Sequence, residues 1–357
     1  MARRGYYFGA GPAALPDAIL QEAQSALLDW SNSGVSILEV GHRSVAFIAL
    51  FEQAEADLRE LLAIPENYHV LFLGGAARTQ FSMIPMNILS EAQAHAAYII
   101  SGVWSSLAFD EAKRFGAAYA IEPGEACRPD TAYVYYTPNE TIDGVQFSDI
   151  PDTGTIPLIA DMTSCLLSEE IDVSRFGLIF AGAQKNIGPA GLTVVIIRDD
   201  LLPLKPKHCV PTMLDYRVHI KHHSLYATPP VFQCYMAACM FQWVKAQGGV
   251  SIFDAINRDK AAKLYAYIDA SSYYRSMVHD VHARSRMNVC FDLIKQEQGV
   301  AFLEAADACG LRGLKGHRMK GGMRASLYNA MPMSGVDALI SFMDDFSKGI
   351  NSCKSKF

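Results

Sequence analysis

The sequence lacks any long hydrophobic run and any excess of positive charge. Its longest apolar runs, such as residues 194–197, are far shorter than the roughly 20 residues that a membrane-spanning helix needs. The formal net charge of −6 provides no broad basic surface for a nucleic-acid backbone. We therefore expect no membrane insertion and no nucleic-acid partner, whereas small anions remain candidates wherever arginines gather locally.

Closely spaced cysteines and an export signal are also missing. The eight cysteines are scattered between Cys127 and Cys353, without the spacing that binds zinc. This cysteine usage is typical of a reducing cytosol. The pair Arg3-Arg4 is not followed by the apolar segment of a signal peptide. We therefore expect a cytoplasmic protein without a metal site.

What the sequence does contain is an alternation of helical and strand-like patterns. Apolar residues recur at helical spacing in residues 47–62 and again in 105–115, which predicts two amphipathic helices. Short apolar runs typical of buried strands lie at residues 69–73, 97–100, 132–136, 158–160, 178–180 and 192–197. This alternation indicates an α/β domain with a largely parallel sheet covered by helices on both faces.

The length of 357 residues exceeds what one compact core usually organises, so a second domain is expected. Five prolines between residues 203 and 230 predict ordered loops rather than regular sheet. A helical pattern follows at residues 231–243. After Gly248-Gly249 comes a region of further helices and strands, with a strand candidate at residues 289–291. We place the smaller domain there, beyond a boundary near residue 250.

Chemically useful residues follow the predicted strands, at the sheet edge where ligands bind. The small-residue turn 74–80 offers free N–H groups at a helix start and so suits a phosphate, although such turns are more often ordinary connections. Asp161 ends one strand, and Lys185 lies in the glycine-rich loop 183–191 after another. Pyridoxal phosphate needs both groups, because a lysine forms its Schiff base and a carboxylate keeps its pyridine nitrogen protonated. A lysine in such a loop is by itself more often a solvated surface residue.

Several long motifs in a fixed order add a resemblance to this hypothesis. They are YTPNETIDG at residues 136–144, GAQKNIGPAG at 182–191, and GHR at 316–318 followed by GGMRAS at 321–326. Together they resemble the phosphoserine aminotransferase family. The similarity begins at residues 11–13 and 39–43 and persists to 328–332, so it covers nearly the whole chain.

The resemblance implies an α/β enzyme of fold type I that uses pyridoxal phosphate. Its large domain, residues 15–250, has a mainly parallel seven-stranded sheet flanked by helices, and its small α+β domain comprises residues 1–14 and 251–357. It also implies a homodimer with shared active sites. The implied reaction is reversible amino transfer between glutamate and 3-phosphohydroxypyruvate, which gives O-phospho-L-serine and 2-oxoglutarate in serine biosynthesis. In some organisms the family also serves pyridoxine biosynthesis.

The resemblance also assigns site residues. Lys185 would bond the cofactor aldehyde and act as general base, and Asp161 would pair with the pyridine nitrogen. Trp104 would stack on the ring. The other implied cofactor contacts are Thr141 at the ring, Ala77, Arg78 and Gln184 at the phosphate, and Thr228 from the neighbouring subunit. Outside this family Trp104 would usually be a core residue and the threonines turn residues.

Five cations match the substrate-binding positions of the family, where a doubly anionic substrate needs guanidinium and imidazole groups. Arg324 is assigned to the amino-acid carboxylate. The distal phosphate or the glutamate side chain is assigned to His42, Arg43, His317 and Arg318. Without the resemblance, all five would be read as surface cations.

Three positions depart from the family pattern, namely Ala76 and Ala77, where glycine is usual, and Ala227, where asparagine is common. They lie at the cofactor phosphate, so we expect binding to survive in a weakened form. Two alternatives follow. One is another reaction on the same scaffold, such as a cysteine desulfurase or an alanine–glyoxylate transaminase, which the five cations argue against. The other is a non-catalytic scaffold protein, which the presence of Lys185 and Asp161 argues against.

Overall fold

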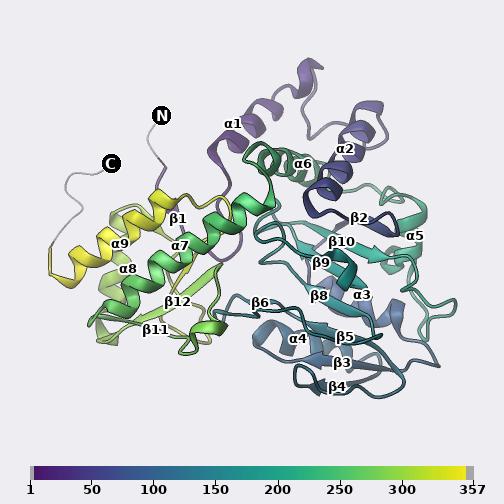
Figure 1. Ribbon diagram of the computed structural model, residues 1–357. Helices are drawn as coiled ribbons and strands as arrows, with labels where there is room; N and C mark the ends of the chain where they lie inside the picture. The colour runs from purple at the N-terminus through teal and green to yellow at the C-terminus, as the bar shows by residue number, and fades with distance from the viewer. Residues whose placement is uncertain (1–3, 351–357) are drawn as a thin grey trace.

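The computed structural model describes residues 4–350. Arg3, Cys353 and the two ends of the expected small domain lie outside the described residues. Figure 1 shows two lobes, a larger one around a central sheet and a smaller one that contains both ends of the described chain. None of the helices in residues 4–350 is long and apolar enough to cross a bilayer.

The larger lobe is built on a seven-stranded sheet, as expected. In spatial order its strands are β2 (Tyr68–Gly74), β10 (Leu192–Arg198), β9 (Leu178–Gly182), β8 (Leu158–Asp161), β5 (Thr131–Tyr136), β3 (His95–Ile99) and β4 (Ala117–Ile121). Five neighbouring strands, from β9 to β4, pair in parallel, whereas β10 is antiparallel to both of its neighbours. The edge strand β4 was not predicted, because only Ile121 of its five residues is buried and it carries no buried apolar run.

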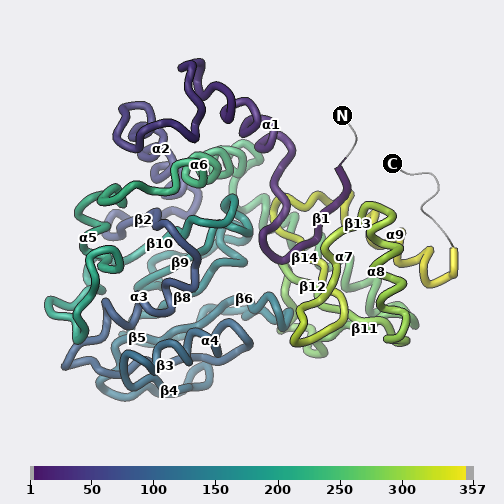
Figure 2. Tube along the Cα trace, turned by 180° about the vertical axis from the view of Figure 1, so that it is seen from behind, coloured from purple at the N-terminus to yellow at the C-terminus, as the bar shows by residue number. Residues whose placement is uncertain are grey.

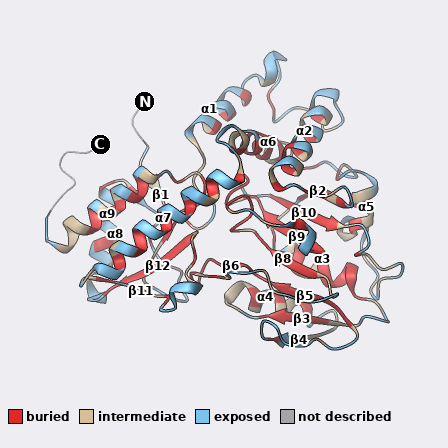
Figure 3. Cartoon of the chain, in the orientation of Figure 1, coloured by how far each residue is buried: buried red, intermediate tan, exposed pale blue. Residues whose placement is uncertain are grey.

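Helices cover both faces of this sheet. On one face lie α2 (Val45–Leu62) and α6 (Val231–Ala246), and on the other α3 (Thr79–Ile88), α4 (Val103–Ala112) and α5 (Tyr216–Lys221). The sheet between them is almost entirely buried (Figure 3). Successive residues of β2 serve opposite cores, with Val70 and Phe72 facing α2 and α6. This confirms the predicted three-layer α/β arrangement.

Local signals explain where key helices begin. Helix α2 starts after Ser44, whose Oγ accepts a hydrogen bond from the N–H of Phe47 at 3.2 Å. The helix predicted at residues 105–115 begins two residues earlier, at Val103, and ends at Ala112. This difference matters because it places Trp104 in the first helical turn.

The smaller lobe combines a short antiparallel sheet with three long helices. Its sheet has the order β11 (Tyr274–Ser276), β12 (Asn288–Leu293) and β14 (Met323–Ser326), and its helices are α7 (Val250–Ala270), α8 (Gly299–Ala308) and α9 (Met333–Ser347). The amino-terminal strand β1 (Tyr6–Tyr7) pairs in parallel with β13 (Leu311–Arg312), and Figure 2 shows the two segments side by side. The start of the chain is therefore part of this lobe.

Several short elements complete the fold. Helix α1 (Asp17–Ala26) packs against α6, and β6 (Asn139–Glu140) and β7 (Val145–Gln146) form a small hairpin between the lobes. The 3-10 helices are Trp30–Asn32, Val173–Arg175, Thr212–Leu214, Val281–Ala283 and Gln296–Gln298.

Helix α7 belongs to both lobes. Val250 and Phe253 in its first turns pack into the core of the larger lobe, whereas Leu264 and Ile268 pack into the core of the smaller one. We propose a large domain of residues 15–250 and a small domain of 1–14 and 251–357, with α7 as the connection between them.

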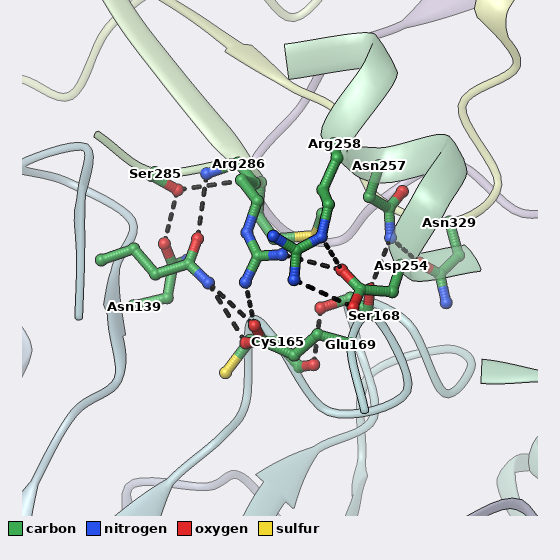
Figure 4. A network of polar contacts seen from close by, with 12 residues as sticks. Asn139, Cys165, Ser168, Glu169, Asp254, Asn257, Arg258, Ser285, Arg286 and Asn329 are labelled. Carbon is green, nitrogen blue, oxygen red and sulfur yellow. Dashed lines mark hydrogen bonds and ion pairs between the residues drawn. The ribbon is translucent and has the colours of Figure 1, made fainter. Parts of the chain in front are cut away.

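A buried polar network holds the two lobes together (Figure 4). Arg286 of the small lobe forms ion pairs with Glu169 of the large lobe and with Asp254 of α7, the latter at 2.8 Å. Asn139 in β6 donates to Asn288 in β12 at 2.9 Å. Because these groups are largely withdrawn from water, their mutual contacts fix the relative position of the lobes.

Candidate active site

A cavity of about 380 Å³ lies beyond the carboxyl ends of β8 and β9, between the two lobes. The structure brings nine of the predicted site residues to its wall: Ala77, Arg78, Trp104, Thr141, Asp161, Gln184, Lys185, His317 and Arg324. Strands from distant parts of the sequence end at the same sheet edge, which explains how residues so far apart in the chain converge.

Lys185 and Asp161 are the two buried charged groups of this cavity. Lys185 is 8% exposed and Asp161 is 6% exposed. Burial lowers the pKa of Lys185 to about 8, although the charge of Asp161 opposes this shift. Burial raises the pKa of Asp161, against the hydrogen bond that its Oδ1 accepts from the N–H of Thr163 at 3.0 Å. The lysine is therefore far more easily deprotonated than an exposed one.

Trp104 is held in place through both its backbone and its ring. Its indole Nε1 donates to Thr141 Oγ1 at 2.9 Å, and its backbone N–H donates to Glu140 Oε2 at 2.9 Å. The guanidinium carbon of Arg78 lies 5.3 Å from the indole centroid, within the range of a cation–π contact. A rigid aromatic plane therefore forms one wall of the cavity.

Two carboxylates hold the amino-terminal turn of α4. These contacts were not predicted from the sequence. Glu140, fully buried, accepts hydrogen bonds from the N–H groups of Trp104 and Ser105, and Asp143 Oδ2 accepts from the N–H of Val103 at 3.0 Å. Carboxylates at this position accept hydrogen bonds from the free N–H groups of the first turn and interact favourably with the positive end of the helix dipole. At Gly102 a Cβ atom would lie 2.5 Å from Asp143 Oδ2, so a glycine is needed there.

The loop that carries these acids also orients Arg324. The Nη1 atom of Arg324 donates to the carbonyl oxygen of Thr141 at 2.8 Å. Thr141 thus contacts Trp104 through its side chain and Arg324 through its backbone. Both acids lie in the YTPNETIDG motif, which was noted for its resemblance, but nothing in the sequence assigned them a structural partner.

The turn before α3 has the features of a phosphate-binding site. The N–H groups of Ala76, Ala77 and Arg78 have no acceptor among residues 4–350, and both alanines have a negative φ. The alanines can therefore present their N–H groups as glycines would. At Gly182 a Cβ atom would lie 2.6 Å from Gln184 Oε1 and 3.1 Å from the Cβ atom of Ala77, so its absence lets these residues approach.

Support from behind Lys185 comes from a turn of the small domain. The backbone N–H of Asn329 donates a hydrogen bond to the side-chain Oδ1 of Asn186, the residue after Lys185, at 3.1 Å. The fully buried Lys260 on α7 donates to the carbonyl oxygens of Leu327, Tyr328 and Met331 at 2.8, 3.0 and 2.9 Å. These contacts couple α7 to the loop that carries Lys185, and sequence patterns gave no sign of them.

Four predicted residues do not line the cavity within this single chain. Arg43 and Thr228 are exposed, His42 is half-buried, and Arg318 lies in the turn beside His317 without lining the cavity itself. The segment Ala10-Gly11-Pro12, in contrast, was not assigned to the site but lies on its wall. It is held there by the Tyr328 hydroxyl, which donates to the Ala10 carbonyl at 2.9 Å.

The residues of this cavity fit pyridoxal phosphate. A buried amine of lowered pKa and a buried carboxylate suit its aldehyde and its pyridine nitrogen, and an indole plane suits its ring. The unpaired N–H groups at the start of α3 suit its phosphate. The required donor types are thus all present in one cavity.

Comparison with known proteins gives the family. A family model described as aminotransferase class-V matches residues 5–339. A phosphoserine aminotransferase from Legionella pneumophila (strain Lens) is 56% identical over 361 residues, which covers 98% of this chain and 99% of the relative. The chain belongs to the phosphoserine aminotransferase family. Membership confirms the predicted class-V, pyridoxal-phosphate-dependent aminotransferase and its place in serine biosynthesis.

Solved structures of the family agree with this fold. The phosphoserine aminotransferase of Bacillus circulans subsp. alkalophilus is 44% identical and has a TM-score of 0.92, covering 97% of this chain and 99% of that one. The Trichomonas vaginalis enzyme, solved with pyridoxal phosphate bound, is 40% identical with a TM-score of 0.89, covering 96% and 100%. The predicted fold type and cofactor are therefore confirmed, while the roles of single residues stay predictions.

Proposed function

We propose that this chain transfers the amino group between glutamate and 3-phosphohydroxypyruvate, with Lys185 and Asp161 as its catalytic residues. The observation that carries the proposal is the convergence of a buried, easily deprotonated Lys185 with the cations Arg324 and His317 in one cavity. A reactive amine together with two cationic groups suits an amino acid that carries a second anionic group besides its α-carboxylate.

When bound, pyridoxal phosphate supplies an electron-withdrawing ring that makes the Cα proton of the amino acid acidic. Lys185 would hold the cofactor, and its freed amine would remove the Cα proton and deliver it to the former aldehyde carbon of the cofactor. Asp161 would accept a hydrogen bond from the ring nitrogen and keep that nitrogen protonated. Trp104 would hold the ring plane and exclude water from one of its faces.

The carboxylate and phosphate groups of the substrate would bind to cationic side chains of the small domain. Arg324 would bind the α-carboxylate, and the Thr141 carbonyl, which accepts a hydrogen bond from its guanidinium, supports this role. His317 and Arg318 would bind the distal phosphate or the glutamate side chain. Burial and the charges of Arg324 and Arg318 lower the pKa of His317, as expected for an imidazole among cations.

A second copy of the chain would complete the site. His42, Arg43 and Thr228 match family positions but do not line the cavity of their own chain. In a homodimer with shared sites they would reach the neighbouring cavity, with Thr228 at the cofactor phosphate. We also propose a cytoplasmic location, because the cysteines are scattered along the sequence and do not have the dense, regular spacing of a disulfide-rich secreted protein.

The test is an absorption spectrum of the purified protein in the presence of pyridoxal phosphate, followed by addition of phosphoserine. We expect a visible band from the lysine-bound cofactor, which phosphoserine bleaches and alanine leaves largely unchanged. Borohydride reduction followed by peptide mapping should then label Lys185. A label on another residue, or a band that responds to alanine or cysteine instead, would contradict the proposal.

A further inference from the structure

A tight turn in the small domain carries two of the substrate-binding candidates. Residues 316–322 are closed by the N–H of Gly316, which donates to the Gly322 carbonyl at 2.9 Å, and they carry His317 and Arg318. At Gly316 a Cβ atom would lie 2.0 Å from the Gly321 carbonyl oxygen, a contact that no side chain permits. The turn is therefore a compact unit, and its position depends on what holds it from outside.

Lys320 ties this turn to the large domain. Its Nζ lies 2.9 Å from Asp143 Oδ1, while Asp143 Oδ2 accepts the N–H of Val103 at 3.0 Å. A single carboxylate thus joins the turn that carries His317 to the helix that carries Trp104. The Lys320 side chain is 48% exposed and that of Asp143 is 13% exposed, so the pair lies at the protein surface where the two domains meet.

Asp143 is an unexpected charge for an anion-binding region. Burial, Arg324 and Arg318 lower the pKa of His317, and the negative charge of Asp143 acts on the same imidazole in the opposite direction. An uncompensated carboxylate there would repel an incoming anion. The ion pair with Lys320 neutralises that carboxylate, and the hydrogen bond to Asp143 raises the pKa of Lys320, so the lysine stays charged at neutral pH.

We propose that Lys320 is a positioning residue that neutralises Asp143 and holds the turn 316–322 against α4, and that this pair favours phosphoserine over glutamate. The inference rests on the proposed function. A phosphate monoester carries close to two negative charges at neutral pH, whereas the glutamate side chain carries one. Repulsion from an exposed Asp143 would therefore weaken phosphoserine binding more than glutamate binding.

The experiment measures half-reactions of the holoenzyme with each amino donor alone, by the loss of the visible cofactor band. Lys320→Met should raise the half-saturating phosphoserine concentration about fivefold and that of glutamate about twofold, with limiting rates nearly unchanged. Adding Asp143→Asn to Lys320→Met should restore the phosphoserine value to within about twofold of the parent, because an amide carries no charge. The asparagine oxygen can still accept the N–H of Val103.

With an active parent enzyme, three outcomes would overturn the inference, and the first is a Lys320→Met variant that binds both donors as the parent does. If the double variant binds phosphoserine as poorly as Lys320→Met, Lys320 contacts the phosphate directly and does not act through Asp143. If both donors are weakened equally, the ion pair does not determine substrate preference. If the parent enzyme shows no response to phosphoserine, the proposed function itself fails, and the inference fails with it. Failure of the inference alone is recognised by a parent enzyme that does respond to phosphoserine.

Two controls separate charge from general damage. Lys320→Arg keeps the positive charge and should bind both donors as the parent does. Lys348→Met removes a similarly exposed lysine, paired with Asp344 at 2.6 Å on α9, and should change neither donor. Melting temperatures of all variants should agree within about two degrees, since exposed ion pairs contribute little to stability.

Discussion

The two sides of the cavity are held by different means. On the large-domain side, Asp161 ends one buried strand of the central sheet, Lys185 follows another, and both are themselves almost completely buried. On the small-domain side, His317 and Arg318 lie in a surface turn that an exposed ion pair holds. Rigid burial suits groups whose proton affinity must be tuned, and a surface turn suits groups that must meet and release a charged substrate. Substitutions should therefore differ greatly in effect between the two sides.

The largest effect is expected for Lys185→Ala. Loss of the only buried amine on the cavity wall should lower kcat by about 10⁴-fold or more, because it removes both the cofactor attachment and the general base. Stopped-flow measurement of the phosphoserine half-reaction checks this. Lys185→Arg, which keeps the charge but not the nucleophile, should be equally impaired. Substantial activity in either variant would place the chemistry elsewhere.

Asp161→Asn should have the next largest effect. An amide cannot keep the ring nitrogen protonated, so kcat should fall by about 10³-fold while the lysine-bound cofactor is still formed. Steady-state kinetics together with the absorption spectrum separate these two results. A loss of cofactor binding with normal kcat in the remaining holoenzyme would show that Asp161 serves binding alone.

Lys260→Met tests the buried support on the small-domain side. It removes the hydrogen bonds that the amine gives to three buried backbone carbonyl oxygens, of which that of Tyr328 keeps the N–H of Met331 as a donor, so we expect a loss of about 3 kcal/mol in the free energy of unfolding. Chemical denaturation measures it. Lys263→Met on the same helix, at an exposed ion pair with Asp337, is the matched control and should cost less than about 1 kcal/mol. Equal losses in the two variants would mean that the buried hydrogen bonds of Lys260 stabilise the fold no more than an exposed ion pair does.

The smallest effect concerns pH. Only the neutral amine attacks an aldehyde, and a Lys185 pKa of about 8 means that its neutral fraction rises steeply as pH increases through 8. The rate at which the cofactor-free protein takes up pyridoxal phosphate should therefore rise about tenfold between pH 7 and pH 9 and then level off. A rate that continues to rise towards pH 10.5 would indicate an ordinary, unperturbed lysine.

The sequence predicted the meeting of Asp161 and Lys185 better than it predicted the contacts that join the two domains. Asp161 and Lys185 follow short apolar runs that could only be buried strands, and parallel strands end at one edge, so their meeting was foreseeable. The pairs Asp143–Lys320 and Arg324–Thr141 join segments that lie more than 170 residues apart, and no periodic pattern signals such contacts. Trp104 was predicted just outside its helix, because its acceptor Glu140 is supplied by a distant loop.

Helix α7 has a consequence for any attempt to divide this protein. Since Val250 and Phe253 fill one core and Leu264 and Ile268 the other, neither half contains a complete interior without it. A cut at residue 250 would remove apolar side chains from the core of the larger piece and leave the smaller piece with a helix end whose hydrophobic residues are exposed to water. The two domains therefore cannot be separated at residue 250 without disrupting both hydrophobic cores.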